Sequence, residues 1–181
     1  MKPVFQRSRE SYGRIITAAL VMGHRPEILV ADARLGRAIS ASSVVEPRLK
    51  RLATTRCADD RMSLLSGYQL CRSRDAGIAD EQLERLATFE SSPNFDRLEK
   101  AVLRYAEEMS RTPAYVSDEA FAGVRSFLSD EQLVELTAAI ALENLHARFN
   151  CAFKLESDGL CALPADHAVR KALARVTNEM S

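Results

Sequence analysis

The sequence predicts an all-α protein, and three observations point to that class. Nearly every segment repeats its apolar residues with the 3.6-residue period of a helix. No run alternates apolar and polar residues for long enough to suggest a strand. The periodic segments are separated by glycines, prolines and serines, which are typical of helix ends. With 181 residues, 46% of them hydrophobic, the chain is expected to form one helical domain over residues 1–181.

The first half of the chain predicts four helices. Gly23 is placed where a helix end favours a residue that tolerates positive φ, and Gly77 has the same place further along. Pro26 suits the first turn of a helix, where its missing N–H costs nothing, and Pro47 opens another. The four helices are expected over about residues 11–22, 26–40, 47–59 and 61–76.

The second half predicts a short helix at about residues 80–87 and three longer ones. Capping boxes begin the first and third of these, with Asp96 and Glu99 in one and Ser129 and Gln132 in the other. Ser117 caps the helix between them. The helix after Ser129 is apolar nearly all round, so it should be central and enclosed by its own chain or by a second subunit. Residues 161–181 form a C-terminal extension with a predicted surface helix.

Charge and composition exclude several classes of function. Lys plus Arg and Asp plus Glu number 25 each, so the formal charge is zero and the net charge gives no overall attraction to nucleic acid or anionic lipid. Charged residues interrupt every apolar stretch before the roughly 20 residues that cross a bilayer. The first ten residues lack the apolar stretch of a secretory signal. We therefore expect a cytoplasmic protein that binds neither membranes nor nucleic acid.

Several segments together resemble the carboxymuconolactone decarboxylase and alkylhydroperoxidase-D-like family, over about residues 24–160. The order and spacing of the segments carry the resemblance. They are residues 26–29, 34–37, 47–49, 95–109 with Thr112 and Pro113, 133–137 with Ile140 and Asn144, and 147–150. The resemblance implies a helical bundle of small subunits that assembles as a homo-oligomer, a trimer or a hexamer.

The resemblance also implies a redox site that this sequence lacks. Peroxidase-type relatives have a Cys-x-x-Cys at the start of the helix that matches residues 61–76, a His four residues later and a Glu on the preceding helix. Counted back from Gly77, the cysteine positions hold Met62 and Leu65 and the His position holds Gln69. Counted forward from Arg56, they hold Ser63 and Ser66. Arg51 stands at the Glu position.

The two counts differ by one residue, and the first register is preferred. A deletion inside a helix would rotate all later residues by about 100°, so the missing residue is placed in the loop at 59–61. Neither register contains a dithiol, so the usual cycle of peroxide reduction cannot run. A redox role for Cys57 with Cys71 is the least favoured alternative, because nothing in the sequence brings their Cα atoms within about 7 Å.

The remaining candidates indicate a cofactor-free small-molecule enzyme or a pocket protein. Glu143, His146 and Asn150 share one helix face, and His146 is the group best suited to acid or base chemistry, whereas the amide of Gln69 cannot titrate. Arg148 could bind an anionic substrate, although a salt bridge to Glu107 or Glu108 is the simpler interpretation.

The remaining residues and motifs bear on substrate contacts, on metals and cofactors, and on the alternative function. Met62, Leu65 and Tyr68 are candidate substrate contacts, although Tyr68 also fits a core position. Glu143 and His146 have a metal-ligand spacing but no second such pair, so no metal is expected. Glycine-rich phosphate loops are absent from the sequence, so no nucleotide cofactor is expected either. A non-catalytic scaffold or ligand sensor is the alternative function.

Introducing the missing side chains tests the register. We expect Met62→Cys with Leu65→Cys and Arg51→Glu to give measurable peroxide consumption in the presence of a dithiol reductant. Ser63→Cys with Ser66→Cys and the same Arg51→Glu is the matched control. Activity in the control alone would overturn the preferred register.

Overall fold

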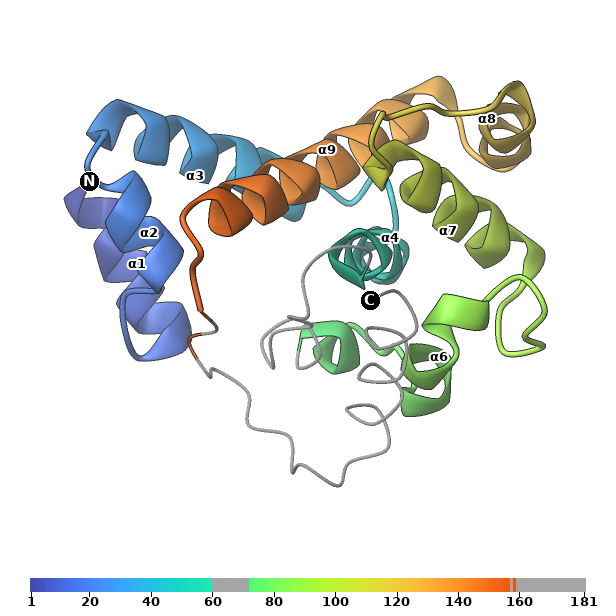
Figure 1. Ribbon diagram of the computed structural model, residues 1–181, viewed down its shortest axis with the longest axis horizontal. Coiled ribbons are helices and arrows are strands. Elements are labelled where there is room, and N and C mark those ends of the chain that lie inside the picture. Colours follow the sequence, from blue (N-terminus) through green and yellow to red (C-terminus); the bar gives the residue numbers. More distant parts are fainter. Residues whose placement is uncertain (60–71, 157, 159–181) are drawn as a thin grey trace.

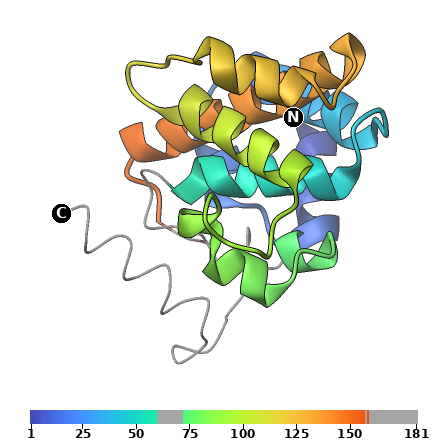
Figure 2. The same ribbon diagram turned by 90° about the vertical axis from the view of Figure 1, so that its right-hand side faces the viewer.

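The computed structural model describes residues 1–59, 72–156 and 158, and all regular structure in that part is helical (Figures 1 and 2). The predicted all-α class is therefore confirmed. Among the described residues, Leu86–Thr88 forms a 3-10 turn. The α-helices are α1 (Lys2–Tyr12), α2 (Thr17–Met22), α3 (Pro26–Ala41), α4 (Pro47–Asp59), α6 (Asp80–Glu84), α7 (Arg97–Ser110), α8 (Asp118–Arg125) and α9 (Asp130–Ala152).

Helix α4 lies at the centre of the molecule, where Figure 1 views it end-on. It packs against α7 and α9, and α8 packs on α7. Helix α3 runs beside α9 and carries α1 and α2 at its start, so the three N-terminal helices lie to one side of the central bundle (Figure 1).

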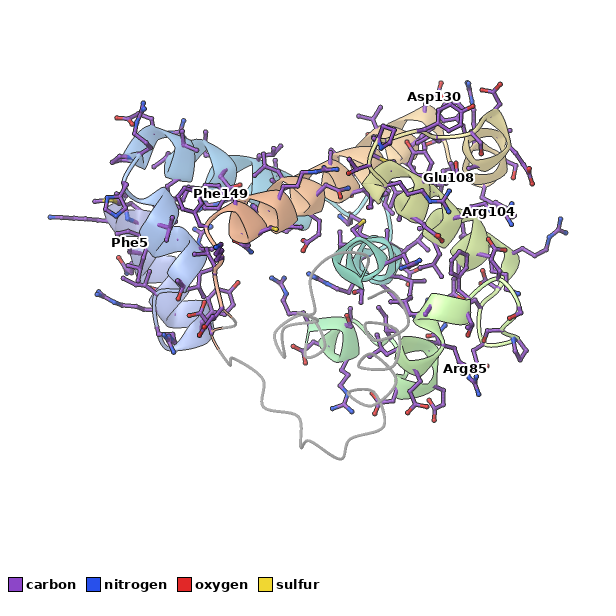
Figure 3. The ribbon with its side chains drawn as sticks, viewed as in Figure 1. Phe5, Arg85, Arg104, Glu108, Asp130 and Phe149 are labelled. Carbon is purple, nitrogen blue, oxygen red and sulfur yellow. The ribbon has the colours of Figure 1, made fainter. Side chains whose placement is uncertain are left out.

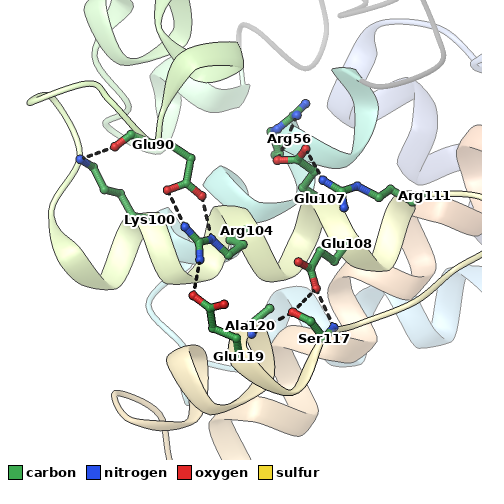
Figure 4. Close-up of polar contacts among 10 residues, drawn as sticks. All are labelled: Arg56, Glu90, Lys100, Arg104, Glu107, Glu108, Arg111, Ser117, Glu119 and Ala120. Carbon is green, nitrogen blue, oxygen red and sulfur yellow. Dashed lines mark hydrogen bonds and ion pairs between the residues drawn. The ribbon is translucent and has the colours of Figure 1, made fainter.

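The helix ends follow the sequence closely in the second half of the chain. Both capping boxes are formed, since the side chains of Asp96 and Ser129 accept hydrogen bonds from the backbone N–H of Glu99 and Gln132. Ser117 caps α8, and Glu108 in turn accepts from the backbone N–H of Ser117 at 2.7 Å (Figure 4). Gly77 has φ +78°, as expected of a residue just past a helix end.

The predicted helix over residues 11–22 is wrong. The chain breaks at Gly13, whose φ is +69°, so that α1 ends before it and α2 begins at Thr17. The hydroxyl of Ser8 stabilises the turn by donating to the carbonyl of Arg14 at 3.0 Å and accepting from the N–H of Ile16 at 3.1 Å. Gly23 has ordinary helical φ of −63°. The position is crowded instead, because a Cβ there would lie 3.0 Å from the ring of Phe5 and that ring would have to shift.

The most enclosed helix is α4 rather than α9. From Leu49 to Cys57 every α4 side chain is buried except Arg51, which is half-buried. Helix α9 buries Leu136 and Ile140 completely, but it leaves Val134 70% exposed and Leu145 50% exposed. The described residues therefore cover α9 on part of its circumference only.

Helix α4 can be central because each of three basic side chains on it pairs with a glutamate. Arg48 lies 2.5 Å from Glu99 and Arg56 lies 3.3 Å from Glu107, both on α7 (Figure 4 shows the second pair). Because the two members of each pair are separated by the same number of residues, α4 and α7 run parallel in one fixed register. The third pair, Lys50 with Glu135, joins α4 to α9 at 2.5 Å.

The Lys50 ammonium group is fully used as a donor. Besides Glu135 it donates to the carbonyl oxygens of Ile39 at 2.8 Å and Ser42 at 2.7 Å, at the end of α3. Burial would raise the pKa of Glu135, but hydrogen bonds from Lys50, Ser42 and the backbone N–H of Val45, with the charge of Lys50, lower it below its ordinary value. One buried ion pair thus fixes α3, α4 and α9 together.

Lys50→Met should destabilise the protein by about 3–5 kcal/mol, because it leaves the Glu135 carboxylate buried without its cation. Urea unfolding at pH 7 measures this. Arg104→Met, which breaks the solvent-exposed ion pairs of Arg104 with Glu90 and Glu119, should cost at most about 1 kcal/mol. The lowered pKa of Glu135 means that the stabilisation is present above pH 4.5 and is lost as the pH falls through the folded-state pKa. Equal losses in the two variants would contradict the central role of Lys50.

Candidate functional site

A cavity of about 920 Å³ lies between the N-terminal helices and the central bundle. Helices α1, α2 and α3 line one side, α4 and residues 72, 75 and 76 line the other, and α9 crosses it. Its apolar wall includes Leu29 and Phe149, which pack in a cluster with Phe5 of α1 (Figure 3 labels both phenylalanines). Its polar wall includes Asp32, Glu143 and His146.

His146 and Asp32 form a hydrogen-bonded pair in this cavity. His146 Nε2 lies 2.7 Å from Asp32 Oδ1, and the two side chains are 36% and 20% exposed. The pair forms because α3 approaches α9 closely, as a Cβ on Gly36 would lie only 3.7 Å from Leu142. A histidine that donates through Nε2 to a carboxylate keeps Nδ1 as a second site for a proton.

The environment favours the protonated form of His146. Burial alone would lower the pKa of His146, but the hydrogen bond and charge of Asp32, together with the charge of Glu143, outweigh it and raise the pKa above the ordinary value of 6.5. The arrangement can therefore supply an imidazolium as an acid near neutral pH and an imidazole as a base after that proton has left.

The structure brings some of the predicted site residues together and not others. Glu143 and Asn150 line the cavity with His146, as their shared helix face predicts. Arg148 is exposed outside the cavity lining, where its Nη2 lies 3.4 Å from Thr112 Oγ1.

The simpler interpretation of Arg148 as a salt-bridge partner is not what the structure shows. Glu107 pairs with Arg56 and Arg111, and Glu108 is used to hold Ser117 (Figure 4). Both glutamates are therefore bound to groups closer to them than Arg148. The other candidates, namely Met62, Ser63, Leu65, Ser66, Tyr68, Gln69 and Cys71, lie outside the described residues.

Cys57 is part of the core and does not line the cavity. Its side chain is buried in the cluster that contains Val102 and Ala106, and its Sγ lies 3.2 Å from the carbonyl oxygen of Ala53. Such a buried thiol lacks the solvent exposure that is typical of a reactive cysteine. Cys151, by contrast, is exposed near the end of α9.

Sequence reasoning missed Asp32, although a signal for it exists. Leu29, Asp32, Ala33 and Gly36 have the i, i+3, i+4, i+7 spacing of one helix face, and all four line the cavity. A carboxylate on the inward face of a helix requires a buried partner, but the sequence alone does not identify that partner. In the described part of the chain, no group of three His, Cys, Asp or Glu side chains is placed to hold a metal ion.

Comparison with known sequences finds relatives without an assigned activity. The chain is 29% identical to the uncharacterised protein YnjA of Escherichia coli (strain K12) over 168 residues, which span 91% of each chain. It is 38% identical to the uncharacterised protein Rv2313c of Mycobacterium tuberculosis (strain H37Rv), over 63 residues that cover 35% of this chain and 22% of the relative. No protein-family model matches the sequence.

Comparison with solved structures confirms the fold that the resemblance implies. The apo debrominase Bmp8 aligns with a TM-score of 0.75 at 23% identity, covering 97% of this chain and 90% of that one. A cysteine-to-alanine variant of Bmp8 in complex with 2,3,4-tribromopyrrole aligns at 0.73 with 22% identity, over 96% and 89% of the two chains.

A third similar structure is described as an AhpD protein. ATU0492 of Agrobacterium tumefaciens, a protein of unknown function described as a putative antioxidant defence protein AhpD, aligns at 0.64 with 23% identity, over 80% and 97% of the two chains. The fold of this chain is therefore the alkylhydroperoxidase-D-like helical fold.

Over the described residues, none of the helices has the length and apolar character needed to span a membrane.

Asp32→Asn should lower the pKa of His146 below 6.5, because the amide removes the largest influence that raises this pKa while the burial that lowers it remains. NMR titration of the imidazole protons measures the shift, with the signals assigned by loss in His146→Gln. Glu143→Gln removes only a more distant charge and should give a smaller decrease. An unchanged pKa in Asp32→Asn would show that the pair does not form in solution.

Proposed function

We propose that the chain binds a small cyclic organic molecule in the His146 cavity and transfers a proton to or from it, in a cofactor-free reaction that uses no thiol. The observation that carries this is the His146–Asp32 pair, held at 2.7 Å against a cavity large enough for a small ligand. We further propose that the chain works as a homo-oligomer, a trimer or a hexamer, as the family resemblance implies.

The chemistry of the pair supports acid–base catalysis. Asp32 holds Nε2 and stabilises the imidazolium, while Nδ1 delivers the proton to an electron-rich carbon of the ligand. When that carbon later releases a proton, Nδ1 takes it and the imidazolium is restored. Asp32 stays ionised throughout, because its role is to orient the ring and balance its charge.

The similar structures support the size of the ligand. The Bmp8 variant was solved with 2,3,4-tribromopyrrole, a small heteroaromatic ring. The same molecule is a useful probe here, since its one unsubstituted ring carbon carries a hydrogen that exchanges with solvent when the ring is protonated. Removal of bromine would need an electron donor and is not part of the proposed reaction.

We expect the wild-type protein to accelerate exchange of that ring hydrogen for deuterium in D₂O, followed by loss of the ¹H NMR signal. His146→Ala should slow the catalysed exchange about 100-fold or more, which is the usual contribution of a general acid or base. His24→Ala, which removes an exposed histidine outside the cavity lining, is the matched control and should leave the rate unchanged.

Binding is measured separately by calorimetry with the same probe. Ala33→Trp should block the cavity and abolish binding, whereas Ala122→Trp on the exposed side of α8 should not. Binding without exchange would favour the alternative function, a ligand sensor. Exchange that persists in His146→Ala would overturn the proposed role of the pair.

A further inference from the structure

The side of α9 that faces away from the cavity carries a symmetric pattern of residues. Glu143 and His146 point into the cavity, and the residues about half a turn away from them are exposed or half-exposed. Val134 is 70% exposed and Leu145 50% exposed, so this side of α9 presents two large apolar side chains to solvent. The outer stripe consists of Glu131, Val134, Ala138, Ala141, Leu145 and Arg148.

The outer stripe is complementary to a second copy of itself that runs in the opposite direction. Its residues form three pairs that are symmetric about the midpoint between residues 139 and 140. The pairs are Glu131 with Arg148, Val134 with Leu145, and Ala138 with Ala141. With 1.5 Å rise and 100° per residue, the members of a pair lie at equal and opposite displacements along and around the helix from that midpoint. A second α9 packed antiparallel on the first therefore places each residue at the same height along the interface as its pair member. A crossing angle between the two helix axes then brings the laterally displaced members of the outer pairs together.

We infer that the outer stripe is an interface between two copies of this chain, paired antiparallel about a two-fold axis that passes between Ala138 and Ala141. The small alanines allow the two helix backbones to approach closely at the axis. Val134 of each copy packs against Leu145 of the other, and Glu131 meets Arg148 at both ends. A self-complementary patch of this kind defines an isologous contact.

Exposed apolar side chains on both flanks extend the surface. Helix α3 runs along one side of α9 and presents Leu35, 48% exposed, next to the contact of Gly36 with Leu142. The segment after α7 runs along the other side, where Thr112 reaches Arg148, and it carries Tyr115, 71% exposed. A stable dimer buries about 1,600 Å² in total, and one helix stripe needs such flanks to approach that area.

The two-fold pairing also selects among the proposed assemblies. An isologous contact joins chains in pairs, so the number of chains must be even. A hexamer can contain this interface in all of its subunits, whereas an isolated trimer cannot. The pairing rests on the self-assembly proposed above but not on the chemistry of the cavity, which lies on the opposite side of α9.

The first test places a charge in the centre of the interface. Leu145→Glu sets a carboxylate against Val134 twice in each dimer, and we expect sedimentation equilibrium to show dissociation at least about 100-fold easier than in the wild type. Phe121→Glu makes the same kind of change at a 40% exposed aromatic residue on α8, outside the stripe, and should leave the association unchanged. Circular dichroism verifies that both variants keep their helix content.

The second test exchanges the charges. Glu131→Arg and Arg148→Glu each place like charges opposite one another and should weaken association about tenfold, while the double variant should restore it to near the wild-type value. A wild-type monomer or trimer would overturn the interface, as would association that Leu145→Glu leaves intact or that the double variant fails to restore. Binding of tribromopyrrole reports on the cavity independently, so the two proposals can fail separately.

Discussion

Three basic side chains on one helix set the architecture of this protein: Lys50 and Arg56 are buried and Arg48 is half-buried. A buried charge is costly unless it is paired and hydrogen-bonded, so Arg48, Lys50 and Arg56 can occupy the centre only with Glu99, Glu135 and Glu107 in place. Apolar contacts alone would tolerate sliding of one helix past another. The paired charges permit one register, because displacement by a single residue would leave three charges without partners.

The same constraint positions the candidate site. Lys50 binds the carbonyl oxygens of Ile39 and Ser42, and it thereby fixes the end of α3 against the start of α9. Helix α3 then runs back along α9, and Asp32 reaches His146. The cavity forms where this return path leaves α1 and α2 apart from α4. The His146–Asp32 pair and the cavity beside it are both consequences of where the buried Lys50–Glu135 ion pair holds α3.

The sequence predicts the local features well because neighbouring residues determine them. The capping boxes at Asp96 and Ser129 and the positive φ of Gly77 require only a few adjacent side chains. The sequence pattern does not predict the break at Gly13, because the apolar period continues through it. The turn there is held by hydrogen bonds of Ser8, which lies on the preceding helix. The spacing of apolar residues gives no indication of such a side-chain contact.

The central position of α4 and the role of Asp32 depend on contacts between distant segments. Helix α4 looks like a surface helix by composition, because paired buried charges and solvated charges are identical in sequence. Helix α9 looks central because its apolar residues surround it, yet the part of the chain that the structure describes covers only some of that surface. The pattern is better explained by neighbours on three sides: α4 and α7 on one side, α3 on another, and the proposed second copy on the outer stripe. A helix with this arrangement has no side left for solvent except the one that faces the cavity, and that side carries Glu143, His146 and Asn150.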